Sequence, residues 1–527
     1  MKVAAHFILT MERNNITFQE LVNGDYGRKV AYTDVERITE ENIVRVVGEA
    51  IGVHNRNRQA IRYLWRYLKG DQPALYRVNT ARDDVNNKVV ENRAYEIVQF
   101  KNGQTNGEPI QAYSLKEDDN INKAVDKFND YCRAAHKHSV DVSSGEWTSA
   151  VGTGFKAVQR KQGDVPFRYV MPSPMNTFAI YSRSTGEEML YCQELKDDKG
   201  ENYILCFDET MEYRIKNGAL METLDTNGQM VKSKPHGFGD FPIREYPNNQ
   251  NRLSDIELVI SCLDAINEMQ SDRVDSIQQF VQSWVKFVNV DIDSETFEKM
   301  KMEGALVVKS NNGENKADVD ILSNELDQGG GQTLKDDMWN STLSILGIPN
   351  KEGNTGGDTQ GAVQLRNGWD FAKSRAKLKD PYTVKPEKQL AMVALNINRQ
   401  ANGDSDCPLK EMDFDVKVDH SPQDNMQVKA QVYQMLVQCG IHPLIAMKTC
   451  GLWGDAEKTY LLSKPYLDVL YKTIDQIEDK EEQERKAQEL IAQYENGETQ
   501  DTARGVLSSN GTTRSGEEEK GTDSQRP

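Results

Sequence analysis

Residues 254–284, SDIELVISCLDAINEMQSDRVDSIQQFVQSW, carry the most regular pattern in the chain. Their apolar side chains recur at intervals of three and four residues, so at about 100° per residue they gather on one side of an α-helix. Ser254 and Asp255 can cap its start, and Glu257 is placed as in a capping box. The pattern predicts one long helix with a continuous apolar face. That face consists of Ile256, Val259, Ile260, Leu263, Ile266, Val274, Ile277, Val281 and Trp284.

Four carboxylates fall on the other side of this predicted helix, and we refer to them as the acidic stripe. Acidic residues on an exposed helix face are usually just solvated. Like charges four residues apart, however, repel and destabilise a helix slightly. The presence of the stripe despite this cost indicates that it has a function. The acidic stripe comprises Asp264, Glu268, Asp272 and Asp275.

A polar, glycine-rich loop, GIPNKEGNTGGDTQGAV, covers residues 347–363 between predicted helices at 333–347 and 359–380. Glycine tolerates positive φ, so such a loop can shift its position. The ordinary interpretation is an exposed linker. Its most polar part has a net charge of −1 and consists of Lys351, Glu352, Gly353, Asn354, Thr355, Gly356, Gly357 and Asp358.

The first half of the chain predicts an α+β domain, because helical patterns precede a series of short strands separated by turn residues. Helices are expected at 35–69, 121–136 and 141–156, an extended–turn–extended segment at 92–114, and strands throughout 165–250.

The second half of the chain has a different order of predicted helices and strands. After the long helix, residues 285–325 predict a small α/β unit inserted between two helices. Further helices are expected at 384–400 and from 423 to about 495, with breaks at 440–443 and 451–454, and a strand at 412–421. Residues 496–527 have almost no large apolar side chains, so they are expected to be disordered.

Bulk properties limit the function classes. With 527 residues the chain exceeds what one core usually supports, so several domains are expected. A net charge of −18 argues against tight duplex binding, although not against letting DNA pass without holding it. The seven cysteines form no C-x-x-C pair, which favours folding in a reducing cytosol over a disulfide framework or a zinc site. No apolar run suits a membrane helix, and the start does not read as a secretion signal.

Motifs for catalysis are scarce. The chain has no P-loop, H-E-x-x-H or G-x-S-x-G sequence, and GQTNG and GGGQT favour plain turns. His136 and His138 are two residues apart and would point apart on a helix, so a helix end is favoured over a metal site, and His442 predicts a turn between helices. The basic residues Arg366, Lys373, Arg375 and Lys377 favour a solvated face or a subunit contact over a nucleic-acid site.

The order of several short motifs resembles the portal proteins of tailed bacteriophages, in the branch related to the SPP1 portal. The resemblance spans roughly 35–490, and the most specific segment is 241–280, FPIREYPNNQNRLSDIELVISCLDAINEMQSDRVDSIQQF. The family's SG-x-A-L-K element appears only as QGAVQLR (360–366), which is a departure. The other motifs are YLKGDQP (67–73), NGEPIQAYS (106–114), GTGFKAV (152–158), DVDILSNELDQ (318–328) and GIPN (347–350).

The resemblance implies an α+β multidomain, ring-forming portal fold with an α+β wing, a helical stem, a small α/β clip and a helical crown. It also implies a subunit that needs neither a cofactor nor a metal and is not an enzyme. The implied boundaries are wing 1–252, first stem helix 253–284, clip 285–329, second stem helix 330–346, tunnel loop 347–363, second wing part 364–421, crown 422–495 and disordered tail 496–527.

The implied function is a ring, usually of twelve subunits, at one capsid vertex, assembled in the bacterial host cytoplasm. Double-stranded DNA passes through it during packaging and ejection, without sequence specificity. The implied partners are the terminase large subunit and a head–tail adaptor at the clip, and the major capsid and scaffolding proteins at the wing, with no membrane.

The acidic stripe suits such a channel. A basic lumen would grip phosphates, whereas carboxylates repel DNA over roughly a Debye length of 8–10 Å. A ring of soft loops could follow the DNA surface without reading bases, because base recognition needs rigid side-chain placement. Two alternatives remain open, a soluble enzyme with an unrecognised site and another ring component of the phage connector.

Overall fold

The computed structural model describes residues 17–78, 85–116, 118–224, 228–281, 284–288, 318–322, 328–350, 368–420, 426–452, 456, 459–460 and 462–463. The chain divides into two compact units, Met1–Pro422 and Gln423–Pro527, each described by itself. Among the helices of the described residues, none combines the length and the apolar composition that crossing a membrane requires.

The N-terminal helices confirm most of the expected pattern. The short helix α2 (Phe18–Val22) begins with a capping box between Thr17 and Glu20. Helix α3 (Ile43–Leu68) falls within the helix predicted at 35–69 and ends just before Gly70, which has a φ of +89°. Helices α5 (Asp119–Ala134) and α6 (Lys137–Val151) also match, although α6 ends five residues early because Gly152 caps it in the left-handed conformation.

The extended segment predicted at 92–114 is wrong over its first half. Helix α4 (Arg93–Asn106) occupies it, and only β2 (Gln111–Ser114) is extended. Gly103, read as part of a turn, is helical because α4 packs tightly on α6, and Gly107 is the C-cap of α4. At the contact, a Cβ on Gly145 would lie 2.1 Å from side-chain atoms of Asn102 and Asn106. The burial of α4 against α6 thus outweighs the local preference of its glycines.

The β-rich region predicted at 165–250 is confirmed and forms two larger sheets. A seven-stranded sheet has the order β1-β5-β6-β7-β8-β12, with β9 paired to β8, and a three-stranded sheet has the order β13-β3-β4. Their strands are β1 (Ala31–Thr33), β3 (Thr153–Arg160), β4 (Phe167–Val170), β5 (Thr177–Ser182), β6 (Glu188–Lys196), β7 (Asn202–Phe207), β8 (Met211–Lys216), β9 (Ala219–Leu220), β12 (Ser233–Pro235) and β13 (Ile243–Pro247). A separate pair joins β10 (Thr223–Leu224) and β11 (Met230–Val231).

The two larger sheets pack face to face, and helices cover their outer faces. Phe155 and Ala157 of β3 meet Tyr191 of β6 in one core cluster between the sheets. On the other side of the seven-stranded sheet, Val47 of α3 lies in a cluster with Ile180. Because side chains alternate along β3, Val158 points to the opposite face and packs in a third cluster, with residues of α5 and α12 (Asp380–Asn402).

Behind β3 lies a buried ion quartet, which we define as Lys137, Asp141, Lys156 and Glu387. The side chain of Lys156 pairs with Asp141 at 2.7 Å and with Glu387, and Lys137 pairs with the same two carboxylates at 2.7 and 2.9 Å. Although burial alone would lower it, the carboxylates of Asp141 and Glu387 raise the pKa of Lys137. Two cations and two anions thus neutralise each other in the interior, and the quartet joins α6, β3 and α12.

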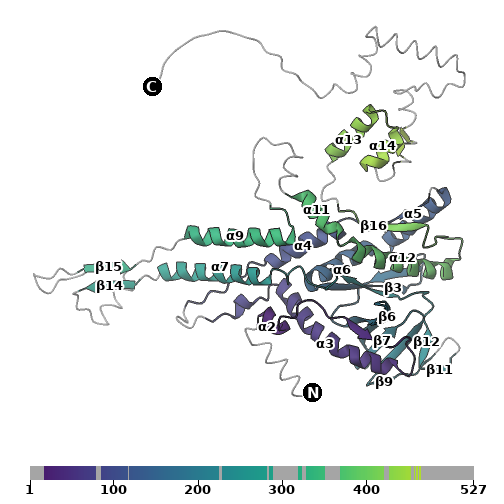
Figure 1. Ribbon diagram of the computed structural model, residues 1–527, viewed down its shortest axis with the longest axis horizontal. Coiled ribbons are helices and arrows are strands. Elements are labelled where there is room, and N and C mark those ends of the chain that lie inside the picture. Colours follow the sequence, from purple (N-terminus) through teal and green to yellow (C-terminus); the bar gives the residue numbers. More distant parts are fainter. Residues whose placement is uncertain are drawn as a thin grey trace, which may run out of the picture. The chain divides into compact units, whose positions relative to one another are not determined.

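Between the two parts of this domain, the chain makes a long excursion. Helix α7 (Ile260–Val281) leads to β14 (Trp284–Val288), and β15 (Asp318–Leu322) leads to helix α9 (Gln328–Leu346). Strands β14 and β15 pair antiparallel, from Trp284 opposite Leu322 to Val288 opposite Asp318. Figure 1 shows α7 and α9 side by side. The helical piece and the strand expected within 289–317 lie outside the described residues.

After the excursion the chain returns to the first domain. Helix α11 (Trp369–Lys377) precedes α12, whose first turn contains Pro381, so the proline starts a new helix after the predicted break. The predicted strand at 412–421 is β16 (Phe414–Lys417), which pairs with β2. In the second unit, α13 (Met426–Gln438) and α14 (Pro443–Cys450) confirm two helices with a break at 440–443. The expected disordered tail, 496–527, lies outside the described residues.

Candidate functional site

The start of α7 is fixed by buried polar contacts. The backbone N–H of Ile256 donates to Ser254 Oγ at 3.0 Å, and the N–H of Ser254 donates to Glu257 Oε2 at 3.1 Å, so the predicted capping contacts form. Arg28 binds the same carboxylate of Glu257 at 2.9 Å. Regular α-helix begins only at Ile260, after a run of turns. The helix therefore starts later than expected, on a base tied to the N-terminal part of the chain.

The acidic stripe lies on one flank of α7, but its members differ in their surroundings. Glu268 is exposed, and the side chain of Asp272 is 60% exposed although it pairs with Arg77 at 2.6 Å. Asp264 accepts a hydrogen bond from Tyr67 Oη at 2.8 Å. Burial raises the pKa of Asp264 to about 6, Tyr67 opposes this rise, and Glu268 adds to it. Asp275 is only 4% exposed.

The expectation of an open acidic face opposite an apolar face is wrong for the second half of α7. Ile256, Val259 and Leu263 are buried as predicted, but Val274 and Ile277 are exposed while Asp275 is buried. Asp275 is buried because the segment 87–91 lies along the polar side of the helix and covers it. The side chains of Val281 and Trp284 lie outside the described residues.

This segment is held by what we call the polar ladder, formed by Asn267, Ser271 and Asp275 at intervals of four residues on α7. Their side chains accept hydrogen bonds from three alternate backbone N–H groups, those of Glu91 (2.8 Å), Val89 (3.0 Å) and Asn87 (2.7 Å), respectively. Helix residues four apart lie one above another, and alternate residues of an extended chain face the same way. The N-x-x-x-S-x-x-x-D spacing was the available signal in the sequence, but nothing in it identified the partner segment.

Helix α9 packs against α7 and α4 through one side only. Leu343 and Leu346 are buried, and Trp339 is half-buried beneath the guanidinium of Arg93, 4.6 Å from its ring centre. Lys335 pairs with Glu91 at 3.0 Å, which links α9 to the segment on the polar ladder. The GGGQT sequence read as a turn lies within the first turns of α9.

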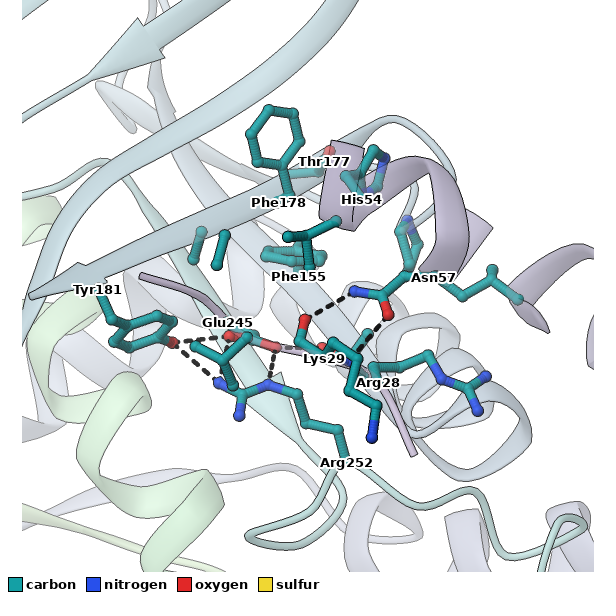
Figure 2. Close-up of a pocket in the computed structure, with 17 residues that line it drawn as sticks. Arg28, Lys29, His54, Asn57, Phe155, Thr177, Phe178, Tyr181, Glu245 and Arg252 are labelled. Atoms are coloured by element: carbon teal, nitrogen blue, oxygen red, sulfur yellow. Dashed lines mark hydrogen bonds and ion pairs between the residues drawn. The ribbon is translucent and has the colours of Figure 1, made fainter. Parts of the chain in front are cut away.

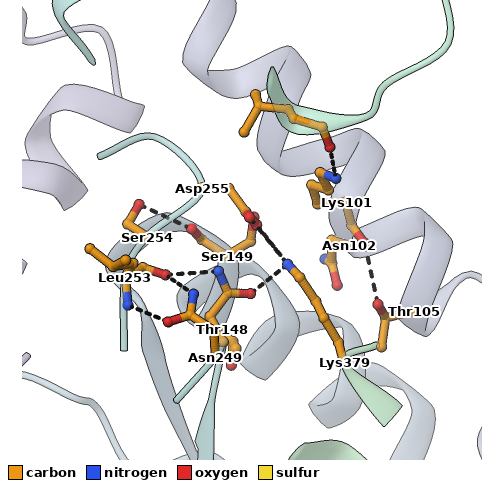
Figure 3. A network of polar contacts seen from close by, with 12 residues as sticks. Lys101, Asn102, Thr105, Thr148, Ser149, Asn249, Leu253, Ser254, Asp255 and Lys379 are labelled. Carbon is orange, nitrogen blue, oxygen red and sulfur yellow. Dashed lines mark hydrogen bonds and ion pairs between the residues drawn. The ribbon is translucent and has the colours of Figure 1, made fainter. Parts of the chain in front are cut away.

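A network at the base of the excursion joins its two ends (Figure 3). Lys379 contacts both carboxylate oxygens of Asp255 at 3.1 Å, and Ser149 Oγ donates to Asp255 at 2.7 Å. Although burial of Asp255 alone would raise it, Lys379 and Lys101 hold the pKa of this carboxyl below its ordinary value. Residue 255 precedes α7 and residue 379 follows α9, with the β14–β15 pair between these helices. The Asp255–Lys379 ion pair therefore joins the two ends of the excursion.

Two further cations hold the end of α9 in place. Lys101 of α4 donates to the carbonyl of Leu346 at 2.5 Å, and Arg375 of α11 donates to that of Ile345 at 2.7 Å. Cations near a helix C-terminus stabilise its unpaired carbonyls and its dipole. Burial lowers the pKa of Lys101 to about 8, Asp255 opposes this, and Lys379 and Arg375 add to it.

These contacts assign a structural role to part of the predicted basic cluster. Arg375 caps α9 and also lies over the ring of Phe371, at 5.4 Å. Lys373 and Lys377 lie on the same helix, and Arg366 lies outside the described residues. Arg375 is therefore an internal contact of the fold and not simply a solvated charge.

A cavity of about 30 Å³ beside α3 and β5 contains a second group of buried charges (Figure 2). There Arg252 binds Glu245 at 2.7 Å, and Tyr181 Oη donates to Glu245 at 2.7 Å. Burial and Arg58 lower the pKa of His54, which lines the same cavity, to about 4. A space of this size holds about one water molecule, so we assign these residues to the stability of the fold.

The remaining candidate residues have local roles. His136 is the N-cap of α6 and has a φ of +53°, and His442 is the N-cap of α14, where its ring accepts a hydrogen bond from the N–H of Leu444. The GQTNG sequence forms the end of α4. Within the part of the chain that the structure describes, no group of three or more His, Cys, Asp or Glu residues could hold a metal ion.

The predicted loop is described only at its start. Gly347, with a φ of +64°, ends α9, and a Cβ there would lie 2.5 Å from Arg375 Cδ, so glycine is favoured at this position. The residues 351–363, which include all eight loop candidates, lie outside the described residues.

Comparisons with known proteins supply the functional context. A family model described as "Phage portal protein, SPP1 Gp6-like" matches residues 49–449. The comparison with curated proteins found no match. The chain is similar to a solved structure described as "Neck of empty GTA particle computed with C6 symmetry", with 10% identity, a TM-score of 0.43, and 68% of this chain and 90% of that chain covered. It is also similar to "Neck of native GTA particle computed with C12 symmetry", with 11% identity, a TM-score of 0.39, and 68% and 89% covered.

Proposed function

The chain belongs to the SPP1 Gp6-like family of phage portal proteins, and from this premise we propose that twelve copies form a ring at one capsid vertex. Duplex DNA passes through this ring during packaging and ejection. The observation that carries the proposal is the family match over residues 49–449, which includes both helices of the excursion.

The described fold supports a stem built from α7 and α9. The two helices lie side by side and are fixed at their base by the Asp255–Lys379 pair, by Lys101 and by Arg375. The β14–β15 pair follows at the far end of the chain excursion, where the clip is expected. A stem clamped in this way can bear force along its axis, because its ends are tied to the buried core of the wing.

The carboxylates that we propose for the channel wall are Glu268 and Asp272, the two exposed members of the acidic stripe. Asp264 and Asp275, the less exposed members, hold α7 to Tyr67 and to the 87–91 segment. Exposed carboxylates repel phosphates at short range, so DNA can slide without being held.

The tunnel loop (347–363), clip (285–329) and crown (422–495) complete the proposal. The loop surrounds the DNA, and the clip docks the terminase large subunit and later a head–tail adaptor. The wing contacts capsid and scaffolding proteins. On this proposal the subunit itself hydrolyses no nucleotide, and assembly takes place in the host cytoplasm.

Imaging and mass measurement of the purified chain test this proposal. Negative-stain micrographs should show rings with a central hole, and native mass spectrometry should give about twelve copies of 59.7 kDa. Particles that remain monomeric or dimeric at all protein concentrations and salt conditions would contradict it and favour the enzyme alternative.

A further inference from the structure

An open groove runs between α4 and α9 and has an apolar floor. Its volume is about 710 Å³, and the apolar part of its lining includes Ile97, Phe100, Trp339, Leu343 and Ile348. A groove with such a floor suits the apolar ridge of a helix.

Most charged residues on the rim of the groove are already paired with one another, and Asp336 is hydrogen-bonded to a neutral side chain. Arg93 binds Glu91 at 3.2 Å and Glu96 at 3.0 Å, and Lys335 binds Glu91 at 3.0 Å. Asp336 accepts a hydrogen bond from Gln332 at 2.7 Å. An incoming surface therefore does not have to neutralise this rim, and an apolar ridge with few charges is compatible with it.

The outer side of α9 carries such a ridge, which we call the α9 ridge: Leu334, Met338, Ser341 and Ile345. Leu334 is 50% exposed and Ile345 is 48% exposed, which is unusual for large apolar side chains on a helix that packs on its other side. Met338 is half-buried and Ser341 is exposed. Their spacing of 4, 3 and 4 residues is that of a helix seam which packs against another helix.

The groove and the ridge lie on nearly opposite sides of the same helix. At about 100° per residue, Trp339 and Leu343 in the groove are roughly 140–180° away from Leu334 and Ser341 on the ridge. Both surfaces also occupy the same stretch of α9, because groove residues run from Gln332 to Leu343 and ridge residues from Leu334 to Ile345.

We infer that the α9 ridge of one copy lies in the α4–α9 groove of the next copy. Different surfaces of the same chain then meet, so the contact is head-to-tail, and it propagates until the ring closes. Because ridge and groove share one stretch of α9, neighbouring copies stand at the same height along the stem, which favours a flat ring over a filament. This inference rests on the proposed ring and names the surfaces that build it.

Two double variants test the α9 ridge and the groove separately. Leu334→Glu with Ile345→Glu places charges on the ridge and leaves the groove intact. Tyr95→Glu with Gln99→Glu places charges on exposed groove positions and leaves the ridge intact. Each variant alone should lose ring formation, with association at least about tenfold weaker, as measured by mass photometry and sedimentation velocity.

Mixing the two variants is the decisive measurement. One intact groove then meets one intact ridge, so the mixture should give a 1:1 heterodimer of twice the 59.7 kDa chain mass, with no larger species. Thr333→Glu serves as a control, because it adds a charge to an exposed position of α9 away from the ridge and should keep wild-type rings. Far-UV circular dichroism and melting temperature verify folding, and Leu334→Ser with Ile345→Ser replaces the ridge variant if it unfolds.

The outcomes distinguish this inference from the proposed function. Rings from the wild type and from both variants would overturn the inference and leave the portal assignment standing. A mixture that stays monomeric would likewise overturn the head-to-tail contact. A wild type without rings would contradict the proposed function itself, and the inference with it.

Discussion

Asp255 and Lys379 are 124 residues apart in the chain and form an ion pair at 3.1 Å, in which Asp255 is buried and Lys379 is half-buried. Between them lie α7, β14, β15 and α9, which belong to the excursion, and then α11, where the chain has returned to the domain. The pair therefore acts as the clasp that joins the turns leading into α7 to the N-cap of α12.

Replacing Lys379 with methionine should lower the free energy of unfolding by about 2 kcal/mol, because Asp255 would keep a buried charge without its cation. The measurement is the thermal and urea midpoint of the purified protein. The double variant with Asp255→Asn should recover part of the loss. Arg183→Met is the control, because the pair of Arg183 and Asp34 is largely exposed and should contribute little. Equal shifts for the two single variants would contradict the role of the clasp.

Asp264 should make stability depend on pH between its ordinary pKa of 3.8 and about 6. Its folded pKa is raised, so the folded protein binds the extra proton in this window, and stability from this group falls as the pH rises from about 4 to 6. Asp264→Asn cannot lose a proton, so it should match the wild type near pH 4 and be more stable by about 3 kcal/mol at pH 7. Melting temperatures across this range test the prediction, and two parallel curves would refute it.

Ser271→Ala should release the middle of the polar ladder. The N–H of Val89 would lose its acceptor, at a cost of about 1–2 kcal/mol, and hydrogen exchange should accelerate across 87–91. Ser261→Ala, at an exposed position of α7, is the matched control and should leave this exchange unchanged. Unaltered protection of 87–91 in the Ser271 variant would show that the ladder does not hold the segment.

On the proposed function, Glu268→Lys should convert a channel wall that repels DNA into one that binds it. Each ring would gain one cation per subunit, so duplex binding should strengthen at least about tenfold at low salt and weaken steeply as salt rises. Filter binding against salt concentration measures this, with Glu268→Gln as the control that removes charge without adding a cation. Identical salt slopes for the lysine variant and the wild type would exclude Glu268 from the path of the DNA.

Shortening the loop within 350–358 should impair DNA packaging or retention and leave ring assembly intact. The physical reason is that a ring of shorter loops leaves a gap around the duplex. Packaged DNA per particle is the measurement, and a replacement of equal length with Gly and Ser is the control. Loss of rings would instead assign the loop to the fold.

The sequence allowed the strands of the β-rich region and most helices to be predicted, because alternation and threes-and-fours spacing are local signals. It failed at 92–106, where Gly103 and Asn106 favour a turn locally but α4 is held by Gly145 of α6, a contact between distant segments. The acidic stripe was identified as a feature, whereas the burial of Asp275 was not. That burial depends on the 87–91 segment, nearly two hundred residues earlier in the chain, whose backbone donates to it.

The buried ion quartet limits how early the domain can finish folding during translation. Lys156 and Glu387 are 231 residues apart, so at 5–20 residues per second roughly 12–46 seconds pass between their translation. During this interval Lys137 and Lys156 have only the carboxylate of Asp141 as an ionic partner within the quartet. Strand β2 likewise lacks its partner strand β16. A nascent chain therefore cannot complete the packing of this domain until the residues through β16 have left the ribosome.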